Sequence, residues 1–191
     1  GNTVEIGTTG GKKGRQGEIG SAALYANKSN IEVDANKVVI NTTNAKEHAF
    51  AVYSNLGSDI KLGKDANAEV QISSSSKGTA LGVAVASAEG AKPPALEGLK
   101  GETSSTPTAV AADGKVTIQG AKINVSAEGK TARGLYAQDN NKISAGNAGS
   151  DIQISAKGED AVGVLALVHG SVDLNGKNAV IKAESNGNQA S

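Results

Sequence analysis

A short pattern recurs along this chain at a nearly constant spacing, and it constrains the fold more than any other feature. Its clearest copies are TARGLYAQDNNKISAG, from Thr131 to Gly146, and DAVGVLALVHGSVDLNG, from Asp160 to Gly176. The matching glycines, Gly134 and Gly163, lie 29 residues apart. The central segment of the pattern occurs five times, as SAALYA (21–26), AFAVYS (49–54), ALGVAV (80–85), ARGLYA (132–137) and AVGVLA (161–166). A pattern that repeats without repeating its residues indicates a solenoid.

Each repeat holds three short runs in which apolar residues alternate with other residues. The first run carries pairs such as Val38/Ile40, the second is the central segment, and the third carries pairs such as Ile60/Leu62. Period two is the strand signal, and the Gly, Asn, Asp and Ser between the runs are turn residues. We therefore predict an all-β fold, a right-handed parallel β-helix with three strands per coil and about five coils. An antiparallel sandwich or barrel is the alternative, but it does not predict the same three-part order in every repeat.

The central segments also predict which side chains face inward. One aliphatic column is expected in the core, and the alternate column, which holds the tyrosines, is expected to point outward and to form a ladder along one face. Arg133 shares the parity of Leu135 and is therefore an awkward core residue. Small residues at equivalent positions indicate a bend or a close backbone approach. The inward column is Leu24, Val52, Val83, Leu135 and Val164, the outward one is Tyr25, Tyr53, Ala84, Tyr136 and Leu165, and the small residues are Ala23, Ala51, Gly82, Gly134 and Gly163.

Composition excludes several classes of function. Nineteen Lys and Arg balance nineteen Asp and Glu, so no net positive field favours nucleic acid or an anionic membrane. Cysteine is absent, which rules out disulfides and thiolate metal sites. No apolar run approaches the length of about 20 residues that a membrane-spanning helix needs. We expect no cofactor, no metal and no insertion of this fragment into a membrane.

The repeats resemble the passenger domains of bacterial autotransporters, the AIDA- and haemagglutinin-like surface adhesins. The matching stretches are TARGLYAQDNNKISAG, DAVGVLALVHGSVDLNG and GTALGVAVAS (78–87), and the resemblance covers most of the chain except residues 87–113. It implies that residues 1–191 are one β-helical fragment of a larger protein. It also implies export to the surface of a Gram-negative bacterium, anchored through a C-terminal barrel beyond this fragment, and a role in adhesion, aggregation or biofilm formation.

One irregularity interrupts the repeat. Residues 87–113 lengthen one corner of the coil and hold all three prolines. Loops on a rigid scaffold commonly carry binding residues. The hypothesis is a ligand-binding patch on a loop insertion, formed by Pro93, Pro94, Leu96 and Leu99; a decoration without a partner is the alternative.

Carboxylates and histidines are the remaining candidates for chemistry. Asp139, Glu159, Asp160 and Asp173 raise the possibility of sugar hydrolysis, which needs two carboxyl groups about 5 to 10 Å apart. Aspartates are also common in turns because they bond the local backbone. His48 and His169 are separated by several repeats, which is too far for a shared metal. No catalytic residues are therefore assigned.

The sequence thus predicts a non-enzymatic surface adhesin. Its expected partner is a protein or glycan receptor on a host or bacterial cell, or a second copy of the same chain. Two alternatives stay open, a polysaccharide-degrading β-helix and a passive stalk that displays another domain.

Overall fold

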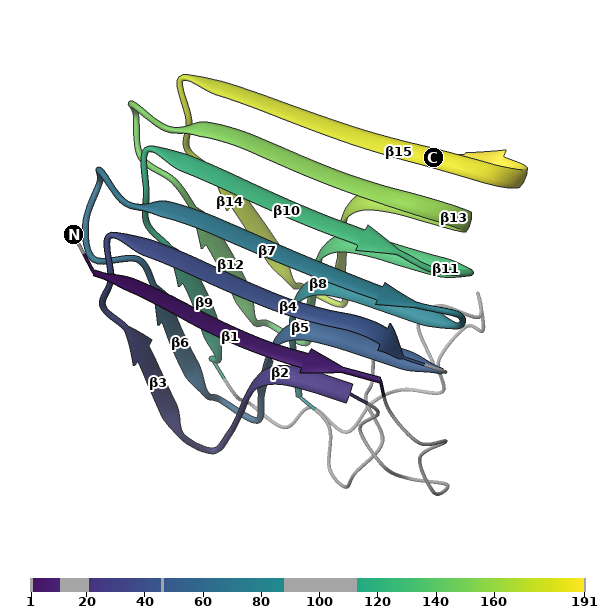
Figure 1. The fold of residues 1–191 in the computed structure, drawn as a ribbon, viewed down its shortest axis with the longest axis horizontal. Coiled ribbons are helices and arrows are strands. Elements are labelled where there is room, and N and C mark those ends of the chain that lie inside the picture. Colours follow the sequence, from purple (N-terminus) through teal and green to yellow (C-terminus); the bar gives the residue numbers. More distant parts are fainter. Residues whose placement is uncertain (1, 11–20, 46, 88–112, 191) are drawn as a thin grey trace.

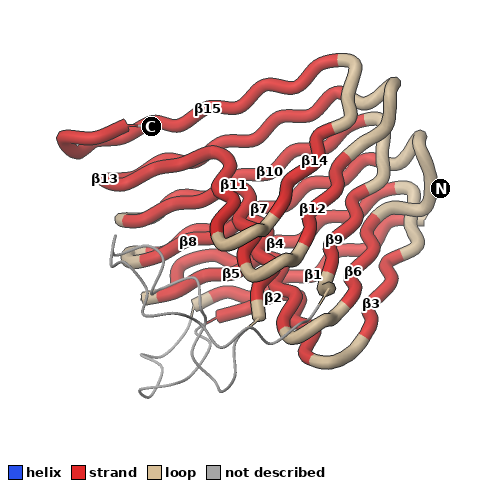
Figure 2. Tube along the Cα trace, turned by 180° about the vertical axis from the view of Figure 1, so that it is seen from behind, coloured by secondary structure: helices blue, strands red, loops and turns tan. Residues whose placement is uncertain are grey.

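The protein is all-β throughout the part of the chain that the structure describes. The computed structural model describes residues 2–10, 21–45, 47–87 and 113–190 of the 191. Fifteen strands and the turns between them make up these residues, and no helix occurs among them (Figure 1; Figure 2). The strands follow one another around three faces of a solenoid, in the order that the sequence repeat predicts.

The strands stack in parallel on three faces. The first face holds β1 (Thr3–Thr9), β4 (Lys37–Ala45), β7 (Glu69–Ser76), β10 (Lys122–Glu128), the first half of β13 (Asp151–Leu167) and β15 (Asn178–Ala190). The second face holds β2 (Ser21–Asn27), β5 (His48–Asn55), β8 (Thr79–Ala86), β11 (Thr131–Gln138) and the second half of β13. The third face holds β3 (Asn30–Val33), β6 (Asp59–Leu62), β9 (Lys115–Ile118), β12 (Lys142–Ala145) and β14 (Ser171–Leu174).

Strand pairing confirms the predicted parallel β-helix. Each strand pairs in parallel with the equivalent strand of the next repeat, as β1 does with β4 and β4 with β7. β13 runs from the first face to the second without a break, which joins these two faces into one ten-stranded sheet. The third face is a separate five-stranded sheet.

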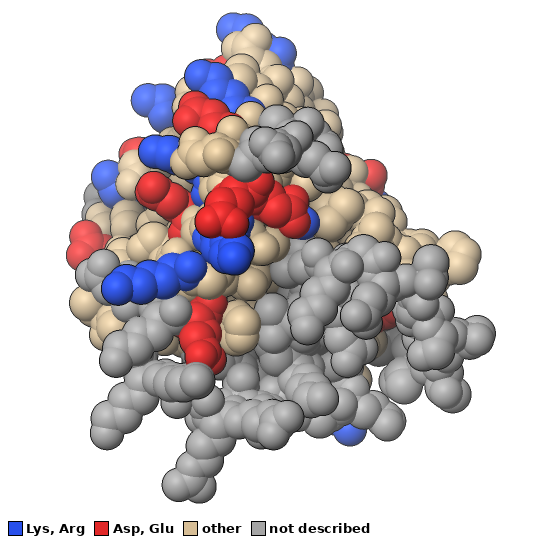
Figure 3. All heavy atoms as spheres, turned by 90° about the vertical axis from the view of Figure 1, so that its right-hand side faces the viewer, with Lys and Arg blue, Asp and Glu red and all other residues tan. Residues whose placement is uncertain are grey.

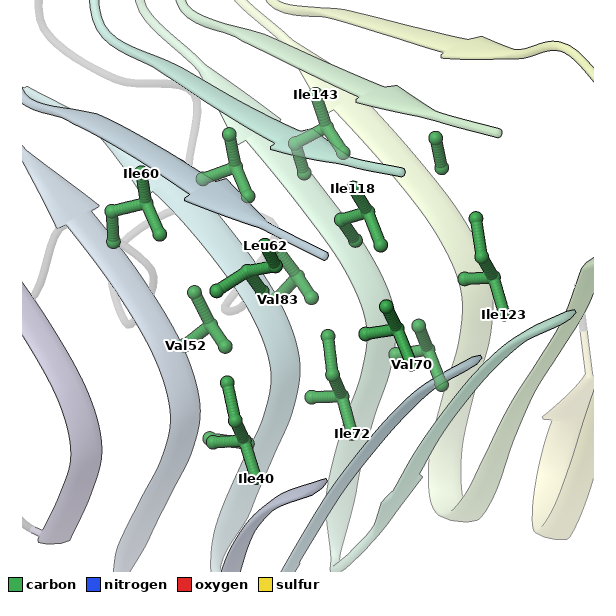
Figure 4. Packing of buried hydrophobic residues seen from close by; sticks show 14 of the residues in the cluster. Ile40, Val52, Ile60, Leu62, Val70, Ile72, Val83, Ile118, Ile123 and Ile143 are labelled. Carbon is green, nitrogen blue, oxygen red and sulfur yellow. The ribbon is translucent and has the colours of Figure 1, made fainter. Parts of the chain in front are cut away.

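An aliphatic core fills the space between the three faces. The register places like residues beside one another, for example Ile40 beside Ile72 and Ile72 beside Val125. Figure 4 shows Ile40, Ile72 and Val52 packed within this core. The predicted inward column lies in it, with Leu24, Val52, Val83 and Leu135 buried and Val164 packed against them. Burial of these side chains is the main force that holds successive coils together.

Small residues let the second face lie close to the first. A Cβ atom added at Gly134 would lie 2.5 Å from the carbonyl oxygen of Gly163 and 2.5 Å from Cγ2 of Ile154. Ala51 and Val52, which are consecutive, both belong to the core, so the strand bends here and the alternation shifts by one residue. The predicted close approach is therefore confirmed.

This bend corrects the prediction for Arg133. We predicted that Arg133 shares the parity of Leu135, but it pairs with Leu81, which pairs with Phe50, and both of these lie in a second apolar cluster outside the core. Arg133 therefore lies on the outer side of the second face. The shift of alternation at Gly134, which simple period-two counting ignores, is the physical reason.

The tyrosines lie on the outer side of the second face, but this side is buried. Tyr53 and Tyr136 are only 1% and 0% exposed and pack with Phe50 and Leu81. The predicted ladder is partial: the rings of Tyr25 and Tyr53 stack with their centres 5.4 Å apart. Ala84 then interrupts the column before Tyr136.

Candidate functional site

The carboxylates that the sequence singled out do not gather into one site. Glu159 and Asp160 lie at the corner between the first and second faces, Asp139 lies in the turn after β11, and Asp173 lies on β14. Three of them pair with different basic residues: Glu159 with Lys130 (3.6 Å), Asp160 with Arg133 (2.8 Å), and Asp173 with Lys142. This distribution is that of structural ion pairs between neighbouring coils.

Asp160 contributes to the structure because its carboxylate neutralises the buried guanidinium of Arg133. The guanidinium of Arg133, which is 4% exposed, donates to the Asp160 carboxylate at 2.8 Å and to its backbone carbonyl at 2.9 Å. A buried charge is costly unless it is paired and hydrogen-bonded. The pair also links β11 to β13, and it fixes the register of these two strands at the corner.

Asp139 lies beside the buried tyrosines. Burial raises the pKa of its carboxyl above the ordinary range, although hydrogen bonds from Ser87 and Gln138 oppose this rise. Burial also raises the pKa values of Tyr53 and Tyr136, and the hydroxyl of Tyr136 donates to Oε1 of Gln138. The hydroxyls of Tyr53 and Tyr136 therefore stay protonated.

The two histidines lie far apart in the fold. His48 begins β5, and its pKa is lowered because it is half-buried; His169 lies in the turn between β13 and β14. Among the described residues, no group of three or more His, Cys, Asp or Glu side chains could hold a metal ion.

The predicted patch of Pro93, Pro94, Leu96 and Leu99 lies outside the described residues. The residues at the two ends of this segment are described, and Asn141 links them. The N–H of Gly114 donates to Oδ1 of Asn141 at 2.8 Å, and Nδ2 of Asn141 donates to the hydroxyl of Ser87 at 3.1 Å. The two ends of the long insertion therefore lie at one point of the β-helix.

A groove on the outer side of the first face is the site that the sequence analysis missed. It has a volume of about 300 Å³, and its lining residues come from five successive strands, β4, β7, β10, β13 and β15. It therefore crosses the strands and runs along the axis of the helix. The lining is Thr43, Ser73, Ser74, Ser75, Ser126, Ala127, Glu128, Ser155, Ala156, Lys157, Lys182 and Glu184.

Two columns of outward-facing residues form the walls of this groove. Ser73, Ser126 and Ser155 occupy equivalent positions on one side. Residues two positions later form the other side, where Glu128 aligns with Lys157 and Lys157 with Glu184. The residues between the columns belong to the inward-facing set, so they contribute backbone to the floor. We name this feature the serine groove.

The serine groove carries hydroxyl groups and has no net charge, although most of the exposed area of its lining is apolar. The hydroxyls of Ser73, Ser126 and Ser155 form no hydrogen bond with any other described residue, and each can both donate and accept. Its two lysines balance its two glutamates, and Lys157 lies 3.7 Å from Glu128. Figure 3, which views the ends of these strands, shows basic and acidic side chains interspersed on the described surface. The serine groove therefore suits an uncharged ligand that carries hydroxyl groups.

The serine column can be recognised in the sequence, but its role as the wall of a groove cannot. Ser73, Ser126 and Ser155 follow their apolar pairs at a fixed distance, which is the signal that could have located this surface. Ser73 and Ser126 are 53 positions apart in the sequence, and the insertion lies between them. Their alignment into one wall therefore depends on how β7 and β10 pair across this separation.

Comparison with known protein families, curated proteins and solved structures found no match. The described part of the chain contains no α-helix that is long and apolar enough to span a membrane.

Proposed function

We propose that this chain is a non-enzymatic adhesive module that acts at a bacterial cell surface. The observation that carries the proposal is the serine groove, in which the same small polar groups recur on successive strands of a rigid solenoid. The resemblance of the repeats to autotransporter passenger domains supports the same role. It also suggests anchoring to the outer membrane of a Gram-negative bacterium through a C-terminal barrel.

Repetition is what makes this surface suited to adhesion. A single serine hydroxyl exchanges a bond to water for a bond to a ligand, and the net gain is only about 1 kcal/mol. Several such groups in a row engage a repetitive ligand together, so that the contacts after the first are intramolecular. A protein or glycan receptor on another cell, or a second copy of this chain, can supply such a repetitive partner.

Neither alternative has a specific observation in its favour. The candidate carboxylates lie at three separate places, and three of the four are engaged in ion pairs. A passive stalk accounts for the solenoid, but it gives no reason for a groove along the axis with serines at equivalent positions of successive strands.

Retention of coated beads tests this proposal. Beads that carry the full chain are incubated with bacterial or host cells, and the retained beads are counted. The double variant Ser126→Arg/Ser155→Arg places two long charged side chains in the groove, so we expect it to abolish retention. The matched control is Thr117→Arg/Ser144→Arg, at equivalent outward positions of β9 and β12 on the third face.

Equal retention by both double variants would remove the groove from the proposal. If the wild-type chain is not retained on any cell type and does not aggregate with itself, the adhesive role is wrong and the stalk is favoured.

A further inference from the structure

The serine groove has a direction, a repeat distance and a charge balance, and together these restrict its ligand. The lining comes from five strands in their order of stacking, so a ligand that fills the groove lies along the axis. Neighbouring strands in a sheet are about 4.8 Å apart, which is close to the length of one hexose unit in an extended polysaccharide. Successive sugar units therefore meet equivalent side chains on successive strands.

Charge balance disfavours ionic polymers. The groove contains Glu128, Lys157, Lys182 and Glu184, which cancel, and the whole chain is neutral. An acidic polysaccharide would meet Glu128 and Glu184 as well as the lysines and would gain little. Hydroxyl groups of a neutral sugar match the open donors and acceptors of Ser126 and Ser155.

The walls also restrict the shape of the ligand. A volume of about 300 Å³ is at the lower end for a small-molecule site and leaves little room for bulky substituents. Because the groove crosses five strands in their order of stacking, an extended chain fits it better than a coiled one. None of the lining residues is aromatic, so no ring stacks on a sugar face and the affinity per unit is low.

We infer that the serine groove binds one straight, uncharged and unsubstituted β-1,4-linked hexose chain, laid along the axis of the helix. This inference rests on the proposed adhesive function and names the ligand class of the same surface. It predicts that affinity rises with chain length up to the span of the groove, because each added unit contacts a further strand.

Titration calorimetry with defined oligosaccharides tests the inference. The full chain is titrated with cellohexaose, with maltohexaose as the curved neutral comparison and with hexagalacturonic acid as the charged one. Among the three hexasaccharides we expect binding to cellohexaose alone, and we expect cellobiose to bind more weakly than cellohexaose. Ser126→Trp fills the middle of the groove and should weaken binding to cellohexaose at least about tenfold.

Two further variants keep the test decisive. Ser144→Trp carries the same change on the outer side of β12 and should bind as the wild type does. Ser155→Trp repeats the block on the neighbouring strand in case Ser126→Trp does not fold, which circular dichroism would reveal. Unchanged binding by a folded groove variant overturns the inference, as does equal binding of maltohexaose or a preference for hexagalacturonic acid.

The bead assay, run with the same proteins, distinguishes two failures. Retention on cells without any binding to cellohexaose overturns the ligand class and leaves the adhesive function in place. Loss of both overturns the two together.

Discussion

The outer sides of the first and second faces are built from the same kind of strand and have opposite characters. On the first face, strands such as β10 and β13 alternate buried and exposed residues, and the exposed ones are polar. On the second face, β5, β8 and β11 are buried along almost their whole length, and Phe50, Tyr53 and Tyr136 lie on the outer side. The inner side of a solenoid strand determines the fold, whereas its outer side is free to serve another purpose.

This difference separates stability from recognition. Residues on the buried outer side of the second face should affect unfolding, and residues in the serine groove should affect only binding.

The largest effect is expected for the aromatic cluster. Phe50→Ala removes a fully buried ring and should lower the free energy of unfolding by about 3–5 kcal/mol. Val39→Ala, on the outer side of β4, is the matched change on the first face and should cost less than about 1.5 kcal/mol. Urea unfolding measures both, and equal losses would contradict the separation.

The small-residue column should be nearly as sensitive. Gly134→Ala places a Cβ atom 2.5 Å from a carbonyl oxygen and from Ile154, so overpacking should cost about 1–3 kcal/mol. Gly149→Ala is the control, because the nearest atom to its added Cβ is 3.4 Å away, in an exposed turn. If thermal melts show the same midpoint for both variants, the close approach of the two faces is wrong.

Substituting the two members of the ion pair between Arg133 and Asp160 should change the stability by different amounts. Asp160→Ala leaves the buried guanidinium of Arg133 without its carboxylate and should cost about 1.5–3 kcal/mol. Arg133→Met removes the buried charge and leaves a half-exposed carboxylate, so it should be nearly neutral. Denaturant unfolding at constant salt measures the difference; a larger loss for Arg133→Met would show that the cation itself stabilises this face.

The pH dependence of Asp139 gives a smaller effect. Since burial raises the pKa of this carboxyl, the folded state holds its proton more tightly than the unfolded chain does. Its contribution to stability is therefore complete below the ordinary carboxyl pKa and is lost as the pH rises through the raised value. Asp139→Asn should stabilise the protein at pH 7 by less than about 1 kcal/mol, because the carboxyl is only partly buried.

Unfolding experiments at pH 4 and pH 7 check this sign. The advantage of Asp139→Asn should be larger at pH 7 than at pH 4. An advantage that is larger at pH 4 would contradict the assigned direction of the pKa shift.

Small changes in stability are expected for variants that remove a single hydroxyl group. Tyr53→Phe removes a hydroxyl without a partner among the described residues, and Ser126→Ala removes an exposed one, so each should change stability by less than about 0.5 kcal/mol. Tyr136→Phe removes the bond to Gln138 and should cost about 1 kcal/mol. Calorimetric melts of the three variants give the order.

Much of the fold could be predicted because solenoids repeat their inner residues. The pairs Val38/Ile40 and Val70/Ile72 indicate the strands and their register directly. The outward position of Arg133 could not be predicted, because the bend at Gly134 breaks the alternation. The burial of Tyr136 could not be predicted either. The alternation along a strand predicts whether a side chain faces inward or outward, but not whether other residues cover the outer side.

The candidate site was harder to predict for a related reason. Serines on an outer side carry no local signal of binding, and only the stacking of β7, β10 and β13 turns them into the wall of a groove. The sequence directed attention to carboxylates and prolines instead. The carboxylates form ion pairs in the structure, and Pro93 and Pro94 lie outside its described residues.

If adhesion depends on the outer side of the first face, blocking that side at a single residue should prevent it. The chain has no cysteine, so single variants Ser126→Cys and Ser144→Cys can each be labelled at one site with a polymer-linked maleimide. Retention of labelled beads on cells is then compared with that of the unlabelled variants. We expect that labelling at residue 126 abolishes retention and that labelling at residue 144 does not. Equal retention of the two labelled proteins would contradict this expectation.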